Sequence, residues 1–213
     1  MQLQEFVDKF GQPYSEMLGI DLKLHKNAET TKWFLASILY GKPIRESSAT
    51  STYHVFEKNG VVTPEKIRKA GWDKLVKLLD KGGYARYDFS TADRLLEIFG
   101  NLEKSYEGDF DRLYRSTTGE NDLEQKLKAL GRGIGDTTVS IFLRDMRVVW
   151  PKAKPPPSPL VKLAMSDLKI KHLERFAKEK HLDIIKLETA LLRYGKDFLR
   201  RGEHLEIDTK KRK

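Results

Sequence analysis

The chain has 213 residues, of which 39% are hydrophobic and 33% are charged, so it can bury a core and lacks the composition of a disordered protein. Its 40 Lys and Arg outnumber its 31 Asp and Glu, which gives a formal charge of +9 and favours polyanionic partners such as nucleic acid. Cysteine is absent, which excludes disulfides, thiol catalysis, cysteine-ligated zinc and iron–sulfur clusters.

The first residues, Met1 to Glu5, lack the apolar stretch of a signal peptide. No segment approaches the roughly 20 apolar residues that span a bilayer. An acidic membrane surface is a rival partner for a basic protein, but no basic amphipathic anchor or lipidation motif supports it. We therefore expect an intracellular monomer, cytoplasmic or nucleoid-associated, with no membrane partner.

Apolar residues recur at helical spacing along most of the chain, and no run alternates as a half-buried strand does. The sequence therefore predicts an all-α fold. The expected helices lie, in chain order, at residues 28–39, 64–70, 72–79, 85–102, 122–130, 136–146, 171–180 and 182–193. The prolines between Pro151 and Pro159 predict a stiff loop without regular helix, and residues 207–213 are expected to form a frayed basic tail.

Local signals place the ends of one helix. Thr63 offers a capping hydroxyl, and Pro64 stands where its missing N–H costs nothing. Gly71 is expected to end this short helix. Trp33 and Trp72 lie on apolar helical faces, which predicts that both belong to the core.

The most informative segment is a glycine-rich turn between two amphipathic helices. The first helix breaks at Gly131, and the second begins at about Asp136. Gly133 and Gly135 can adopt positive φ and expose bare amides. Together with the N-terminal amides of the second helix, they are expected to form a positive concavity suited to a phosphate. Ile134 is expected to turn inward and hold the hairpin on the core.

Lys128 and Arg132 would add positive charge beside this turn, and Thr137 lies in the first turn of the second helix. Such contacts grip a nucleic-acid backbone without reading its sequence, and they predict strong salt dependence. The alternative is a tight helix–helix turn that binds nothing. A monovalent or alkaline-earth ion at the hairpin carbonyls is compatible with the sequence, and no other cofactor is expected.

The segment resembles the helix-hairpin-helix of the endonuclease III and 3-methyladenine glycosylase (HhH-GPD) superfamily. Residues 34–42, 82–95 and 150–161 resemble further pieces of that family, so that residues 28–165 are covered in all. The resemblance implies one all-α unit over residues 1–213, made of two packed helical lobes, with the hairpin at about 122–147. It also implies a partner, damaged double-stranded DNA, whose base is extruded into a pocket between the lobes before its N-glycosidic bond is cleaved.

Two catalytic positions of the family are not matched. Thr137 stands where bifunctional members carry the lysine that forms a Schiff base. Ser158, which precedes Val161 by three residues, is the best match to the family aspartate, whereas an ungapped alignment from Trp150 places proline there. The sequence therefore predicts no lyase step of the usual kind and puts ordinary glycosylase chemistry in doubt.

Three carboxylates are candidates to replace the family aspartate. Asp136 begins the second hairpin helix, where an N-cap role is the alternative. Asp145 follows Arg144, where a surface ion pair is the alternative, and Asp88 can simply cap the next helix.

The resemblance also assigns side chains that would contact an extruded nucleotide. Lys42 occupies the loop where relatives place a residue that fills the gap left by the flipped base; a solvated loop lysine is the alternative. Tyr40, Tyr84 and Tyr87 can stack on a base, although at least one of them is expected in the core. Lys152 can contact phosphate or remain solvated.

Two readings of function follow, and a third is less favoured. The first is a monofunctional or divergent DNA glycosylase of base-excision repair, a hydrolase. The second is a catalytically inactive module that binds damaged, abasic or bent duplex. The third is a structure-specific RNA binder that uses the same hairpin amides. The five histidines show no metal-ligand spacing, so no transition-metal site is expected.

Overall fold

The computed structural model describes residues 1–209, and within them the protein is all-helical, as the sequence predicts. The α-helices are α1 (Leu3–Phe10), α2 (Tyr14–Met17), α3 (Asn27–Tyr40), α4 (Glu46–Lys58), α5 (Pro64–Gly82), α6 (Asp88–Tyr106), α7 (Phe110–Arg115), α8 (Glu120–Lys128), α9 (Asp136–Met146), α10 (Pro159–Asp167), α11 (Leu173–Glu179) and α12 (Ile184–Asp197). Two 3₁₀ helices, η1 (Leu22–Leu24) and η2 (Leu199–Arg201), complete them. None of these helices combines the length and apolar character needed to cross a bilayer.

The chain forms two compact units. The central unit comprises Leu18–Pro155, and the terminal unit joins Met1–Met17 to the segment that begins at Pro156. Helices α8 and α9 and the turn between them therefore lie wholly in the central unit, whereas Ser158 belongs to the terminal unit.

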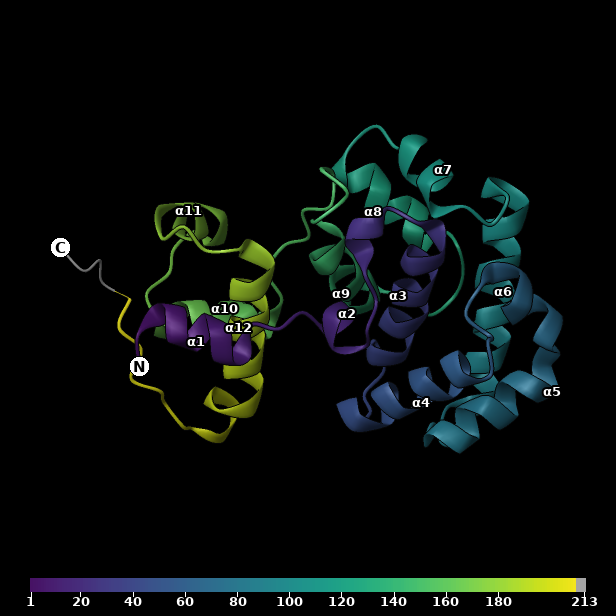
Figure 1. The fold of residues 1–213 in the computed structure, drawn as a ribbon, viewed down its shortest axis with the longest axis horizontal. Helices are drawn as coiled ribbons and strands as arrows, with labels where there is room; N and C mark the ends of the chain where they lie inside the picture. The colour runs from purple at the N-terminus through teal and green to yellow at the C-terminus, as the bar shows by residue number, and fades with distance from the viewer. Residues whose placement is uncertain (210–213) are drawn as a thin grey trace. The chain divides into compact units, whose positions relative to one another are not determined.

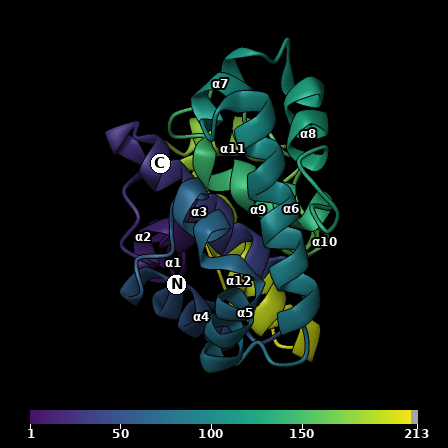
Figure 2. The same cartoon turned by 90° about the vertical axis from the view of Figure 1, so that its right-hand side faces the viewer.

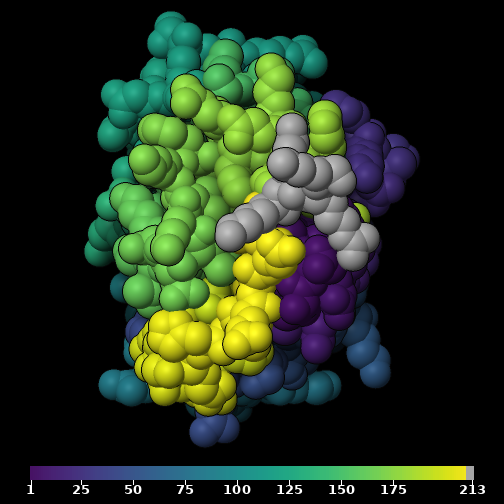
Figure 3. Space-filling model, turned by 90° about the vertical axis from the view of Figure 1, so that its left-hand side faces the viewer, coloured from purple at the N-terminus to yellow at the C-terminus, as the bar shows by residue number. Residues whose placement is uncertain are grey.

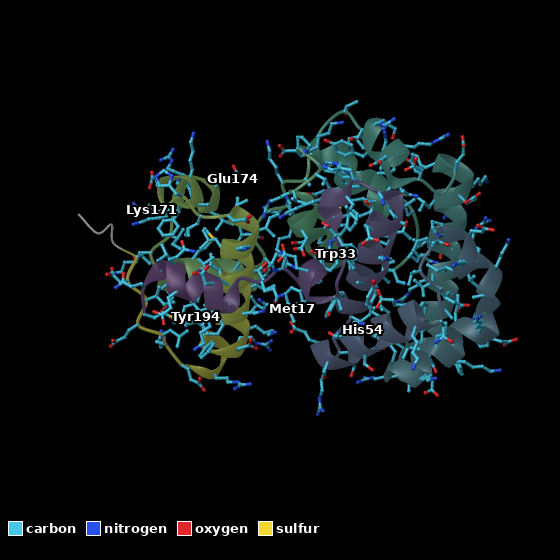
Figure 4. All side chains as sticks on the ribbon, viewed as in Figure 1. Met17, Trp33, His54, Lys171, Glu174 and Tyr194 are labelled. Carbon is cyan, nitrogen blue, oxygen red and sulfur yellow. The ribbon has the colours of Figure 1, made fainter. Side chains whose placement is uncertain are left out.

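Helix α3 forms the centre of the central unit and contacts α4, α7 and α9 (Figure 1). Trp33 is fully buried among these helices (Figure 4), and its indole N–H donates to the carbonyl of Phe142 at 3.0 Å. The ring of Phe34 packs on those of Phe99, Phe110 and Phe142 at centroid distances of 6.3, 4.7 and 4.9 Å. The core thus joins α3, α6, α7 and α9, which fixes the second hairpin helix to the middle of the unit.

Helices α5 and α6 lie side by side (Figure 2). Thr63 caps α5 through its side chain, and Pro64 is its first residue, as the sequence predicts. Gly71 interrupts α5 with φ 70° and ψ 172°, so the predicted break is confirmed, although the helix continues beyond it to Gly82.

Trp72, which follows this kink, is not a core residue. Its side chain is 39% exposed, and its ring lies 5.3 Å from that of Phe89, which is 59% exposed. The prediction of burial is wrong because the kink at Gly71 changes the direction in which the next turn presents its side chains, an effect that helical periodicity does not record.

The terminal unit has its own core, built from α1, α10, α11 and α12. Its buried members are Leu3, Phe6, Val7, Val161, Ala164, Met165, Leu168, Ile170, Leu173, Ala177, Leu187, Ala190, Leu191 and Tyr194. Tyr194 lies on α12 in the middle of this unit (Figure 4). Helix α10 begins at Pro159, with Ser158 as its N-cap. The stiff loop predicted up to Pro159 therefore ends in a helix, because proline is favoured in a first helical turn.

The C-terminal segment lies beside the first helix of the terminal unit (Figure 3). Asp208 pairs with Gln2 in an isolated bridge, and its amide donates to the carbonyl of Met1 at 3.0 Å. The prediction of a frayed tail is therefore wrong for Asp208, which is bound to the first residues of the chain, and for Ile207, which packs against the core of the terminal unit. The remaining residues of the predicted basic tail, 210–213, lie outside the described part of the chain.

Candidate nucleic-acid interface

Helices α8 and α9 form the predicted hairpin, with the turn at residues 129–135. Gly133 has φ 91°, in the left-handed region that favours glycine. Gly135 has φ −101° and ψ −176°, so the prediction of positive φ is correct for Gly133 and wrong for Gly135. Gly135 is instead the N-cap of α9, and Asp136 is the first helical residue rather than the cap.

The turn is held on helix α6. Ile134 is 6% exposed, which confirms that it faces inward. A Cβ on Gly131 would lie 2.8 Å from Ile98 Cγ1, so the backbone there approaches α6 closely. Asn101 of α6 donates through Nδ2 to the carbonyl of Leu130 at 2.9 Å. These contacts with the core and with α6 fix the position of the turn.

Backbone amides of the turn and of the first turn of α9 have no acceptor in the described part of the chain. The N–H groups of Gly133, Gly135 and Thr137 donate to no acceptor within residues 1–209. The amide of Arg132 is already engaged, since it donates to Glu97 Oε1 at 3.3 Å. Open amides at a helix N-terminus carry a partial positive charge and bind anions.

Arg94 of α6 brings a cation to this turn, and the sequence reasoning missed it. A Cβ on Gly133 would lie 2.7 Å from Arg94 Cδ and 3.0 Å from Arg94 Nε. Arg94 lies three residues before Glu97, which also contacts the turn, so both side chains lie on one face of α6. The three-residue spacing of Arg94 and Glu97 is the signal that the sequence offers for this site. It becomes informative only once α6 is known to pack on the hairpin.

The loop after α3 reaches the same place. A Cβ on Gly41 would collide with the side-chain oxygen of Thr138, in the first turn of α9. The next residue, Lys42, is half-buried. Its pKa is lowered, first by burial and then by the positive charge of Arg94. The structure therefore brings Lys42 to the hairpin, together with a cation that the sequence did not identify.

The cations at the hairpin differ in their partners. Arg132 is paired with Glu97 at 3.1 Å, and Lys128 with Asp136 at 2.6 Å. The hydrogen bond from Arg132 lowers the pKa of Glu97, and the hydrogen bond to Asp136 raises the pKa of Lys128.

Lys42 and Arg94, in contrast, form no ion pair with any carboxylate of the described chain. We call Lys42, Arg94 and the open amides of Gly133, Gly135 and Thr137 the hairpin cluster. It gathers two cations that form no ion pair of their own, although the Glu97 carboxylate, paired with Arg132, lies near enough for the charge of Arg94 to lower its pKa.

The three tyrosines proposed for a base pocket separate into two kinds. Tyr84 is 1% exposed, and its hydroxyl donates to the carbonyl of Leu39 at 2.7 Å. It is a core residue that anchors the end of α3, and the prediction that it stacks on a base is wrong. Tyr40 and Tyr87 are half-buried. Tyr40 shares a hydrogen bond of 2.6 Å with Thr50.

The candidate carboxylates are all engaged in local contacts. Asp136 pairs with Lys128, and its side chain is 93% exposed. Asp88 is the first residue of α6 and accepts a hydrogen bond from the amide of Phe89 at 2.7 Å. Asp145 is buried and pairs with Arg144 at 2.8 Å, so the alternative of a surface ion pair is wrong.

Thr137 is exposed in the first turn of α9. Ser158 caps α10, where its hydroxyl accepts a hydrogen bond from the amide of Val161 at 3.4 Å. Lys152 is neither solvated nor free for phosphate: its ammonium donates to the carbonyl of Thr117 and, at 3.0 Å, to Thr117 Oγ1. None of these positions offers a carboxylate or an open amine.

Within the described residues, no group of three His, Asp or Glu side chains is arranged to hold a metal. At the hairpin the carbonyl of Leu130 already accepts from Asn101, and that of Gly131 accepts from the amide of Ile134 at 3.4 Å. An ion at the hairpin carbonyls stays a prediction.

Comparison with protein-family models, with curated proteins and with solved structures finds no match to this chain. The interpretation of the hairpin cluster therefore depends on its geometry and its charge.

Proposed function

We propose that this protein binds double-stranded DNA through the sugar-phosphate backbone and acts on damaged duplex in base-excision repair. The observation that carries the proposal is the hairpin cluster. Lys42 and Arg94 are electrostatically coupled and form no ion pair within the described residues, and Arg94 lies beside open amides that precede α9. Two neighbouring cations repel each other, and a phosphate oxygen relieves that repulsion and satisfies the amides.

The chemistry of these groups suits a phosphate, and the charge of the chain suits a polyanion. Backbone amides of a glycine turn approach a phosphate closely because no Cβ intervenes. The formal charge of +9 adds long-range attraction to a polyanion. Contacts of this kind position the duplex and do not read its sequence, so discrimination of damage would depend on how readily the duplex bends or opens.

Binding is tested by fluorescence anisotropy with a labelled duplex, undamaged or carrying one abasic site, over a series of salt concentrations. We expect Arg94→Ala to weaken binding by roughly tenfold, because one phosphate contact is lost. Lys69→Ala is the matched control: Lys69 is an exposed lysine of the same unit that pairs with Glu65. Equal affinity of Arg94→Ala and the wild type would place the DNA elsewhere on the protein.

A monofunctional or divergent DNA glycosylase is the second candidate, and Asp145 is the observation that favours it. A buried carboxylate on the second hairpin helix is paired with an arginine, and a carboxylate is the kind of group that stabilises an oxocarbenium ion. The catalytically inactive module has support of its own, because Thr137 and Ser158 carry no charge and Asp88 and Asp136 are engaged near the chain surface.

A nicking assay separates these two candidates. Duplexes that carry uracil, hypoxanthine, 8-oxoguanine or a methylated base are incubated with the protein and then treated with or without alkali. Strand cleavage only after alkali indicates glycosylase activity. Lesion-selective binding without cleavage indicates the module. Loss of cleavage in Asp145→Asn, with the helical circular dichroism signal retained, would assign the catalytic role to the Asp145 carboxylate.

A further inference from the structure

We propose that the terminal unit carries a second surface for the sugar-phosphate backbone of DNA, on helix α11 and the two loops that flank it. This surface, which we call the α11 surface, consists of Lys169, Lys171, Arg175, Lys178 and Lys180. The inference rests on the proposed DNA binding and adds a contact to it. The α11 surface shares no residue with the hairpin cluster and belongs to the other compact unit.

The fold of the terminal unit buries the apolar residues of α11 and leaves its cations in solvent. Leu173 and Ala177 lie in the core of the unit. Arg175 and Lys178 are exposed, and their three-residue spacing places them on one face of the helix. Lys171, just before the helix, is exposed as well and lies on the surface of the unit (Figure 4). Packing of the apolar positions therefore presents these cations together.

The cations of the α11 surface outnumber the carboxylates among them and are not paired with them. Residues 169–181 contain five Lys and Arg but two carboxylates, Glu174 and Glu179. Helical spacing would allow Glu174 to pair with Lys178 and Glu179 to pair with Arg175. Neither carboxylate forms an ion pair within residues 1–209. The surface therefore keeps a net positive charge.

The carboxylates of the terminal unit are concentrated in two other segments. Residues 1–17 and 203–208 contain one lysine, Lys9, and six carboxylates: Glu5, Asp8, Glu16, Glu203, Glu206 and Asp208. These segments are bound to each other, since the amine of Met1 donates to the carbonyl of Glu206 at 2.9 Å. The separation of an acidic segment pair from a basic helix gives the unit a local positive field, which attracts a polyanion to α11.

The chemistry of the α11 surface favours a phosphate backbone over a lipid bilayer. A helix that lies on a membrane inserts large apolar side chains among the lipids. None of the exposed large apolar residues of the described chain belongs to α11; they are Met17, Leu24, Trp72, Phe89, Val148 and Leu163. Phe176 of α11 packs against the core, and the ammonium of Lys180 lies 5.7 Å from the centre of its ring. Cations without apolar neighbours contact phosphates and do not read bases.

The experiment measures the affinity of the full-length protein for a labelled duplex over a series of salt concentrations. The α11 variant combines Lys171→Gln, Arg175→Gln and Lys178→Gln. We expect it to weaken binding at least about tenfold at low salt. We also expect the slope of log affinity against log salt concentration to fall in magnitude by about 2–3, because each phosphate contact contributes about 0.9.

The control variant removes the same charge from other elements of the same unit. It combines Lys186→Gln on α12 with Arg200→Gln and Arg201→Gln on η2, all of which are exposed. This variant should keep most of the affinity. Both variants alter exposed side chains, so their melting temperatures should stay close to that of the wild type.

Acetylation of lysines, read by mass spectrometry, locates the contact directly. The wild-type protein is treated with acetic anhydride in the presence and absence of duplex. We expect the duplex to protect Lys171 and Lys178 and to leave Lys186 reactive. If both surfaces contact DNA independently, addition of Arg94→Ala to the α11 variant should multiply the two losses of affinity.

The outcomes separate this inference from the proposed function. Wild-type affinity of the α11 variant, an equal loss in the control variant, or unprotected Lys171 and Lys178 overturns the α11 surface while the hairpin cluster stands. A loss in the α11 variant together with full affinity of Arg94→Ala supports the α11 surface and overturns the hairpin cluster. Failure of the wild type to bind any duplex overturns both, and binding to vesicles of anionic phospholipid that the α11 variant loses would then assign the surface to a membrane.

Discussion

The side chain of Arg94 lies across the backbone of Gly133, with room for no more than a hydrogen between them. A Cβ at residue 133 would stand 2.7 Å from Arg94 Cδ, and the residue has φ 91°. The left-handed backbone therefore favours glycine at this position, and any larger residue would also displace the flexible side chain of Arg94. The same contact holds the guanidinium at the open amides of the hairpin.

Gly133→Ala should weaken both folding and binding. The left-handed conformation costs a non-glycine residue roughly 1–2 kcal/mol, and the new methyl group would push Arg94 away from the hairpin. Gly135→Ala is the comparison, because Gly135 has φ −101° and open space around it; the replacement of this N-cap glycine should cost no more than about 1 kcal/mol. Chemical denaturation of both variants checks this, and equal losses of stability would contradict it.

Arg94→Ala should also change the salt dependence of DNA affinity. Each phosphate contact contributes about 0.9 to the slope of log affinity against log salt concentration. Removal of Arg94 should therefore lower the magnitude of that slope by about 1. Isothermal titration at several salt concentrations measures it. An unchanged slope would mean that Arg94 does not contact phosphate.

Lys152→Met should destabilise the protein without affecting DNA binding. The ammonium of Lys152 is bound to the Thr117 carbonyl and hydroxyl, and it lies 4.7 Å from the centre of the Tyr114 ring. Loss of hydrogen bonds to a charged group costs about 1.5–3 kcal/mol. The variant also removes one positive charge from the central unit, so a loss of affinity as large as that of Arg94→Ala would show that net charge alone explains binding.

Asp122→Asn should lower the melting temperature at neutral pH but not in acid. The carboxylate accepts hydrogen bonds from the Thr118 amide at 2.8 Å and its hydroxyl at 3.2 Å, and it pairs with Lys126. The Thr118 amide is the first cause of its lowered pKa.

A lowered carboxyl pKa in the folded state contributes stability above the ordinary pKa, and this stability is lost as pH falls through the folded-state pKa. Thermal unfolding of both proteins at about pH 7 and about pH 2 tests it. A difference in melting temperature that persists in acid would mean that the carboxylate charge is not the cause.

Gly82→Ala should destabilise the contact between α4 and α5. A Cβ at residue 82 would collide with both the backbone and the side chain of Thr52. Overpacking of this kind costs about 1–3 kcal/mol. Gly100→Ala is the control, since a Cβ at that position of α6 meets nothing. Denaturant unfolding should show a loss for Gly82→Ala alone.

The sequence predicts the start of a helix best where a few adjacent residues form a cap or a first turn. Thr63 and Pro64 mark the start of α5, and Asp136 begins α9, because caps and first turns depend on local hydrogen bonds and fixed φ. Helix α4 was missed, since its buried apolar residues Ala49, Tyr53 and Phe56 are few among polar ones. A helix with few apolar residues is stabilised mainly by packing against neighbouring helices, and the sequence pattern of the helix itself does not show those neighbours.

Burial of individual aromatic residues was not determined by the sequence. Trp72 and Tyr84 both follow glycines on apolar segments, yet Trp72 is 39% exposed and Tyr84 is 1% exposed. The difference comes from the direction of the chain after Gly71 and from the carbonyl of Leu39, which receives the Tyr84 hydroxyl. Neither can be seen in a pattern of neighbouring residues.

The sequence by itself determined that the chain is helical and that a glycine turn between α8 and α9 exposes peptide amides, because backbone conformation there is set by the residues of the turn. Only the tertiary structure decided that Arg94 lies against Gly133, that its charge acts on Lys42, and that Glu97 is paired with Arg132 at the same turn. Residues on separate helices meet through packing of the core between them, and that packing is a property of the whole unit.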